Sequence, residues 1–190
     1  MSYVTYTTEA LVCGGRVNNT SDKSLLLYTE EAGMLWTSAR SLREERSKQR
    51  YALQDFSLVR VSLVKGKTGW RVGSATSFKN YYKTAATRES RGGVVAVVKL
   101  LRQFIHGEEA TPIIYADTKQ ALEAIVDAAP EQVSLYQDLY TYRLLYQLGY
   151  IAKDELSEAL TDEEIWQSAI QPLSTRQEEA IKNAIAVSHL

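Results

Sequence analysis

The spacing of apolar residues changes near residue 80, and this change constrains the fold more than any other feature. Before it, short apolar runs are separated by turn-forming residues, and Val59, Val61 and Leu63 alternate with Arg60 and Ser62 as in a half-buried strand. After it, apolar residues recur every three or four positions, as on one face of a helix. The sequence therefore predicts an α+β chain whose strands precede its helices.

Five strand candidates lie before the change in spacing, each bounded by Gly, Asn, Ser or Asp. They cover residues 8–14, 24–29, 34–39, 56–64 and 70–75, with the longest insertion between the third and the fourth. This count fits the OB-fold, a five-stranded, partly open Greek-key barrel that binds oligonucleotides. We therefore predict an OB-fold nucleic-acid-binding domain over residues 1–80 and an all-helical bundle domain over residues 81–190.

The helical pattern after residue 80 predicts three main helices, at residues 94–106, 116–128 and 130–148. Capping boxes that begin at Thr161 and Ser174 predict two shorter helices. Five tyrosines lie in or just after the third main helix: Tyr136, Tyr140, Tyr142, Tyr146 and Tyr150. They either pack the core of the bundle or line a peptide-binding groove.

The connection between the third and fourth predicted strands is strongly basic. Five of its eleven residues are cationic: Arg40, Arg43, Arg46, Lys48 and Arg50. A basic connection on a small sheet suits a polyanion, because Lys and Arg displace the counterions condensed on phosphates. The alternative is a solvated helix stabilised by its own ion pairs, since Glu44 precedes Lys48 by four residues.

The net charge of −1 hides a large asymmetry along the chain. Residues 1–107 contain 17 Lys and Arg against 8 Asp and Glu, a balance of +9. Residues 108–190 contain 5 against 15, a balance of −10. The sequence thus predicts an anion-binding front half and an acidic back half.

Catalytic and metal-binding motifs are weak in this sequence. Cys13 is the single cysteine, and His106 and His189 are the only histidines, so neither a disulfide nor a Cys/His zinc set can form within the chain. The Gly-Lys-Thr run at 66–68 lacks the first glycine of a phosphate-binding loop, because Val61 stands there. We therefore expect no enzyme and no cofactor. We also expect a cytoplasmic protein, because the N-terminus lacks a signal-peptide pattern and no apolar run approaches about 20 residues.

Several short segments follow one another in the order and spacing of a known family. They are Thr8–Val12, Ser21–Asp22, Leu27–Gly33, Ala39–Arg40, Ala52–Phe56, Ser62–Gly66, Trp70–Arg71 and Tyr142–Tyr150. Together they resemble RecO, the bacterial recombination mediator of DNA repair, over roughly residues 5–150. The last segment is similar to the end of a helix in which that family carries an RLL…LGY pattern.

The resemblance implies an OB-fold followed by a helical domain, in a nucleoid-associated protein without catalytic activity. RecO proteins bind single- and double-stranded DNA and anneal complementary strands. With RecR, they help load RecA onto DNA coated by single-strand-binding protein (SSB), whose acidic C-terminal tail they also bind. Many members carry a four-cysteine zinc module after the LGY position. Residues 151–190 contain no cysteine, so we expect no zinc here.

These observations predict a DNA-binding surface on the front half of the chain. The residues expected to track phosphates are Arg40, Arg43, Arg46, Lys48 and Arg50 from the connection, and Lys65, Lys67 and Arg71 from the following hairpin. Trp36 and Trp70 either stack on bases or pack in the barrel core. An alternative function is a protein-interaction adaptor, in which the same cations dock acidic partner tails and DNA contact is incidental.

Overall fold

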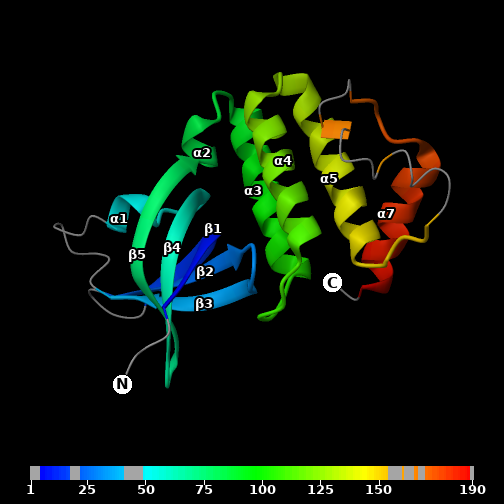
Figure 1. Cartoon of the computed structure of the whole chain (residues 1–190). Helices are drawn as coiled ribbons and strands as arrows, with labels where there is room; N and C mark the ends of the chain where they lie inside the picture. Colours follow the sequence, from blue (N-terminus) through cyan, green and yellow to red (C-terminus); the bar gives the residue numbers. More distant parts are fainter. Residues whose placement is uncertain are drawn as a thin grey trace. The chain divides into compact units, whose positions relative to one another are not determined.

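The computed structural model describes residues 5–17, 22–40, 49–153, 160, 165–166 and 170–188 (Figure 1). Its strands are β1 Thr5–Val17, β2 Lys23–Thr29, β3 Gly33–Ala39, β4 Ser57–Gly66 and β5 Gly69–Asn80. They form a closed barrel in the order β1-β2-β3-β5-β4, and helices follow. The prediction of a five-stranded OB-fold barrel before a helical domain is therefore confirmed.

The barrel closes around side chains from alternate positions of its strands. Because side chains alternate between the two faces of a strand, every second residue points inward. The buried cluster consists of Ala10, Val12, Leu25, Leu27, Leu35, Ala39, Leu53, Val59, Val61 and Leu63. Leu53 reaches this core from the chain just after α1 (Gln49–Ala52), a short helix that overlaps the end of the basic connection, where a helix was the alternative interpretation.

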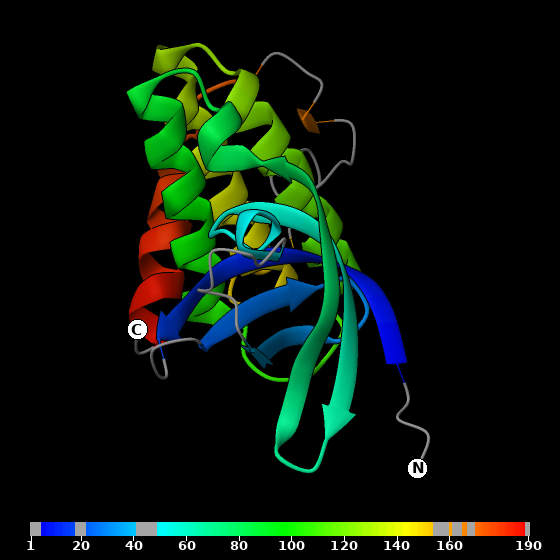
Figure 2. The same cartoon turned by 90° about the vertical axis from the view of Figure 1, so that its left-hand side faces the viewer.

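Strands β1 and β5 are longer than the apolar pattern predicted. β1 pairs antiparallel with β4 through Thr5–Leu11 and with β2 through Ala10–Val17, so its polar ends are held by backbone pairing. β5 pairs antiparallel with β4 from Asn80 to Gly69. The resulting β4–β5 hairpin is long and projects beyond the rest of the barrel (Figure 2).

The barrel is closed on its other side by a short parallel contact between β3 and β5. Only two residue pairs form it, Thr37 with Trp70 and Ser38 with Arg71. Each other pair of neighbouring strands is joined over seven or more residue pairs. The strands at this contact therefore diverge soon after they meet, and the surface is open beside them.

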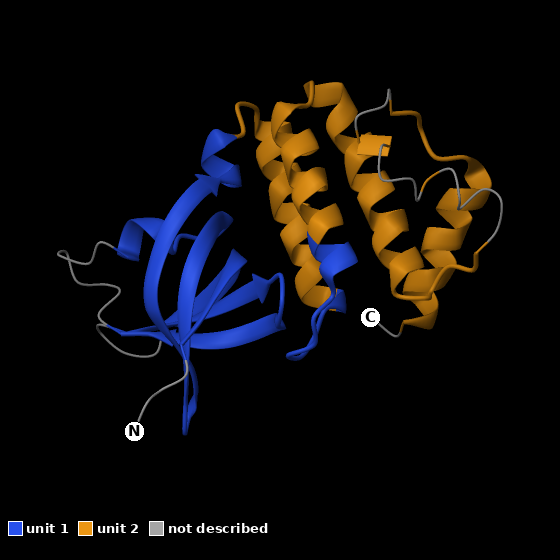
Figure 3. Cartoon of the chain, in the orientation of Figure 1, with its two compact units in different colours: residues 1–84, 104–115 blue, residues 85–103, 116–190 orange. Residues whose placement is uncertain are grey.

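The chain divides into two compact units, shown in different colours in Figure 3. Unit 1 holds residues 1–84 and 104–115, and unit 2 holds residues 85–103 and 116–190. Within unit 1, Met34 N–H donates to the Gly107 carbonyl at 2.9 Å, and the Tyr28 hydroxyl lies 2.6 Å from Thr111 Oγ1. Burial raises the pKa of Tyr28 to about 12. The domain boundary expected at residue 80 stays a prediction.

The longer helices are α3 Arg88–Phe104, α4 Pro112–Asp127, α5 Val133–Gln147 and α7 Thr175–Val187. α3 to α5 correspond to the three predicted helices, and a 3₁₀ turn, η1 (Pro130–Gln132), opens the third. α2 (Tyr81–Thr84) is a further short helix. The predicted capping box at Ser174 is present, whereas the one at Thr161 lies outside the described residues. Among the described residues, none of the helices has the combination of length and apolar composition that a transmembrane helix needs.

A buried ion pair ties unit 2 together. Arg143 Nε lies 2.7 Å from Asp117 Oδ2, and both side chains are 4% exposed. Trp166 Nε1 and Gln147 Nε2 also donate to the Asp117 carboxylate, at 2.8 and 2.9 Å. Because breaking a buried pair leaves an uncompensated charge, this network holds α4, α5 and residue 166 in one arrangement. Of the five tyrosines, Tyr140 and Tyr142 are buried.

Candidate nucleic-acid interface

One row of paired residues crosses four strands on the outer face of the barrel. The register joins Arg16 of β1 to Ser24 of β2, Ser24 to Ser38 of β3, and Ser38 to Arg71 of β5. Directly paired residues point to the same face of a sheet. The neighbouring position in β2 is Leu25, which belongs to the buried core, so the row faces outward. Two arginines thus share one face although 55 positions separate them in sequence.

Trp36 lies on the same face, two residues before Ser38 in β3. Its side chain is 44% exposed, and the guanidinium carbon of Arg16 lies 4.9 Å from the centre of its ring. A cation over an exposed indole restrains the ring and leaves aromatic surface available for stacking. Sequence reasoning missed Arg16, because a single arginine beside a turn gives no signal until the register places it next to Trp36.

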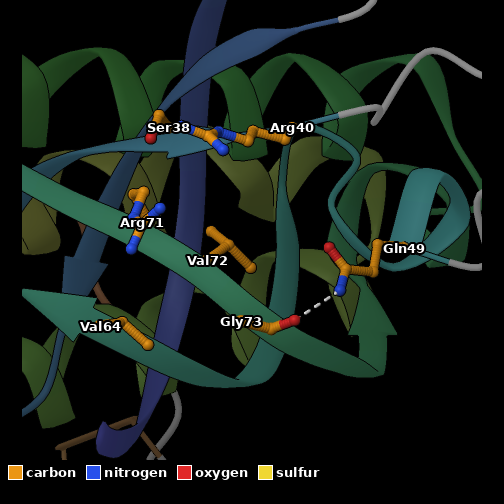
Figure 4. A pocket seen from close by; sticks show the side chains of 7 residues that line it. All are labelled: Ser38, Arg40, Gln49, Val64, Arg71, Val72 and Gly73. Carbon is orange, nitrogen blue, oxygen red and sulfur yellow. Dashed lines mark hydrogen bonds between the residues drawn. The ribbon is translucent and has the colours of Figure 1, made fainter. Parts of the chain in front are cut away.

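An open pocket of about 290 Å³ lies where β3 and β5 diverge. Its lining residues are Ser38, Arg40, Gln49, Val64, Arg71, Val72 and Gly73. Figure 4 shows Arg40 and Arg71 at the Ser38 end, and Gln49 at the other end with its amide nitrogen 2.9 Å from the Gly73 carbonyl oxygen. The structure therefore places two of the predicted phosphate-binding arginines at one pocket.

The hairpin residues have a different environment. Lys65 Nζ lies 4.9 Å from the centre of the Trp70 ring and 3.3 Å from Glu108 Oε2, in an exposed ion pair. Trp70 is half-buried against the barrel core beside Tyr6, and its Nε1 is buried without a hydrogen-bond partner. Trp70 is thus a packing residue, whereas Trp36 is available at the surface. Lys67 is exposed at the turn of the hairpin.

The remaining predicted site residues come from the basic connection. Arg40 is exposed at the end of β3, and Arg50 is exposed on α1, next to the pocket residue Gln49. Arg43, Arg46 and Lys48 lie outside the described residues. Their part in DNA binding therefore stays a prediction. Among the residues that the structure describes, no group of three or more His, Cys, Asp or Glu side chains could hold a metal ion.

Comparison with known proteins gives a distant similarity. No protein-family model matches the chain. Two curated proteins from two strains of Desulfitobacterium hafniense, both named DNA repair protein RecO, are 26% identical to it over 145 residues. The match covers 76% of this chain and 52% of each relative, so the chain spans about half the length of the curated relatives it matches. Over 76% of its length the chain is therefore similar to proteins named DNA repair protein RecO.

Proposed function

We propose that this protein binds DNA and acts as a recombination mediator in DNA repair. The observation that carries the proposal is the outer face of the barrel, where Arg16 lies over the exposed Trp36 ring and Arg40 and Arg71 line the pocket at the β3–β5 contact. The similarity to proteins named DNA repair protein RecO supports the biological setting. OB-folds bind oligonucleotides with the same part of the barrel, the face of strands 2 and 3 and the loop between strands 4 and 5.

The arrangement suits sequence-independent binding of a single strand better than sequence-specific recognition of bases. Guanidinium groups contact phosphates, which every sequence presents alike. An exposed indole stacks on any base, because every base has an aromatic face. The surface would therefore hold DNA without reading its sequence and leave base edges free to pair.

The finer parts of the proposal follow from the family resemblance. The protein would bind single- and double-stranded DNA and anneal complementary strands without catalysing a reaction. It would act with RecR to help load RecA on DNA coated by SSB, and it would contact the SSB tail. Annealing has a physical basis, because a cationic surface lowers the repulsion between two strands.

Fluorescence anisotropy of a labelled oligonucleotide, measured at several salt concentrations, tests DNA binding. The wild-type protein should lose affinity steeply as salt rises, and Arg40→Ala/Arg71→Ala should reduce the log–log slope by about 2. The matched control is Lys99→Ala/Arg102→Ala, which removes two exposed cations from α3 and should leave the slope unchanged. A salt-independent affinity, or equal slopes for both double variants, would contradict the proposal.

The second candidate function is an adaptor that docks acidic partner tails. The exposed pair between Lys65 and Glu108 favours it, because a carboxylate already occupies this cationic corner beside Trp70. An exposed pair contributes only about 0–1 kcal/mol, so a partner's carboxylate can replace Glu108. An adaptor should bind an acidic peptide at salt concentrations that abolish oligonucleotide binding. Failure to bind the peptide at low salt would exclude this reading.

A further inference from the structure

The pocket beside β3 and β5 is built into the topology of the barrel. Beyond their two residue pairs, the strands separate. The pairing of β5 with β4 also shifts between Ser62 and Leu63, which leaves Gly73 as the extra residue of a bulge. A bulge bends its strand and disrupts the local ladder. The opening therefore follows from the strand pairing and does not depend on a mobile side chain.

The rim of the pocket is fixed by the short helix α1. Leu53 is 2% exposed in the barrel core, and its N–H donates to the Gln49 carbonyl at 2.9 Å. The Gln49 amide in turn donates to the Gly73 carbonyl at 2.9 Å. This contact uses one of the two N–H donors of the amide. The pocket is thus preorganised, which lowers the ordering cost of binding.

The lining changes in character from one end to the other. Arg40 and Arg71 supply positive charge at one end, and Gln49 supplies an amide at the far end (Figure 4). The apolar wall consists of Val64 and of the side of Val72 that its packing against the barrel core leaves accessible. Phosphate matches the guanidinium groups through charge-assisted, bidentate hydrogen bonds. The apolar wall has no role for a bare phosphate, but it matches the face of a sugar or a base.

We infer that this pocket receives one unpaired nucleotide of a DNA single strand. The phosphate lies on Arg40 and Arg71, and the base lies against Val64 and Val72 with its edge toward Gln49. A volume of about 290 Å³ suits a group as large as one nucleotide. This inference rests on the proposed DNA-binding function and adds to it a preference for single strands.

The preference has a simple physical cause. A base in a duplex is stacked and paired, so it must leave the helix before it can reach the valine wall. A duplex therefore contacts only the cationic end of the pocket, while a single strand contacts both the cationic end and the valine wall. The valines offer no hydrogen bonds to the base edge, so the wall tolerates every base.

Filling the pocket without changing its charge tests the inference. Val64→Phe should weaken binding of a single-stranded oligonucleotide on the order of fivefold and leave duplex binding unchanged. Thr76→Phe is the matched control, because it adds a similar aromatic ring to an exposed position on β5 that does not line the pocket. Circular dichroism melting should be used to check that both variants are folded.

A second measurement leaves the pocket unaltered. In Trp36→Ala protein, where indole stacking is removed, a single strand should still bind on the order of fivefold more tightly than an abasic strand with the same phosphates. Equal affinities for the two strands overturn the inference, as do equal losses of single-strand and duplex binding in Val64→Phe. In either case salt-dependent DNA binding by the wild type would keep the proposed function standing. Failure of the wild type to bind any DNA would contradict both the inference about the pocket and the proposed function.

Discussion

The two tryptophans of the barrel show how similar residues take different roles. Trp36 is exposed on the outer face with Arg16 over its ring. Trp70 is half-buried against the core, with Tyr6 at a ring-centre distance of 6.4 Å. The sequence left both tryptophans open between stacking and packing, because a strand pattern does not say which face meets the core. Trp36 pairs with Leu26, and the neighbouring residue Leu25 points into the core. Because neighbouring residues of a strand point to opposite faces, Leu26 and its partner Trp36 point outward.

We therefore predict opposite phenotypes for the two alanine variants. Trp36→Ala should weaken single-strand binding by about 1–3 kcal/mol, because one base loses its stacking partner, and should leave the free energy of unfolding unchanged. Trp70→Ala should lower the free energy of unfolding by about 2 kcal/mol through lost packing. Anisotropy and urea denaturation measure the two effects. A loss of stability in Trp36→Ala as large as that in Trp70→Ala would contradict this assignment.

Individual site residues were only partly predictable. Arg40 and Arg71 were expected from their charge and from their places at the end of one strand and in the next hairpin, and the structure brings both to one pocket. Arg16 and Gln49 were not expected, because their importance depends on register and on α1. Short apolar patterns define which strands exist, but pairing across the barrel defines which residues become neighbours.

At the scale of elements, the apolar period predicted all five strands and the three main helices, and it placed their ends less well. β5 continues to Asn80 through polar residues because β4 supplies its backbone partners. α4 begins at Pro112, earlier than the apolar pattern suggested, since proline suits the first turn of a helix. The short helix α2 was missed, because four residues cannot show a period of 3.6. α1 overlaps only the last two residues of the connection for which a helix was the alternative.

The turn between β2 and β3 lies very close to the segment that contains Glu109. Gly33 has φ of +68°, and a Cβ there would lie 2.2 Å from the Glu109 carbonyl oxygen. Gly69, in the β4–β5 turn, has φ of +111° and open space around it. Both glycines avoid the strain of a left-handed conformation. Only Gly33 is also required by the close approach of another segment.

Replacing each glycine by alanine separates the two effects. Gly69→Ala should cost about 1 kcal/mol from backbone strain alone. Gly33→Ala should cost about 2 kcal/mol more, because the segment containing Glu109 must move. Urea denaturation of both variants gives the difference. Equal losses of stability would show that the 104–115 segment yields freely and does not brace this turn.

At the scale of the whole molecule, charge is divided along the chain. The net charge of −1 suggests little attraction to DNA, yet residues 1–107 carry a balance of +9. Binding depends on local charge within about one Debye length, roughly 10 Å at 0.1 M salt, so the average over the chain is a poor guide. Composition by halves predicts that residues 1–107 bind anions, but composition does not locate a surface within that half.

Strand annealing should follow from this local charge. The wild-type protein should accelerate pairing of two complementary oligonucleotides, because cations reduce repulsion between the strands. Arg40→Ala/Arg71→Ala should remove most of the acceleration, and Lys99→Ala/Arg102→Ala should keep it. A fluorescence-quenching assay with labelled strands measures the rates. Acceleration that survives the first double variant would place annealing on another surface.

The two-pair contact between β3 and β5 has a consequence for how ligand and fold influence each other. It is the shortest strand pairing of the barrel, and Arg40 lies on its β3 side and Arg71 on its β5 side. A nucleic acid bound by both arginines would link β3 and β5 across this short contact. By mass action, a ligand that binds the closed barrel more tightly than an opened barrel stabilises the closed barrel. The affinity for nucleic acid and the stability of the closed barrel are therefore coupled at the β3–β5 contact.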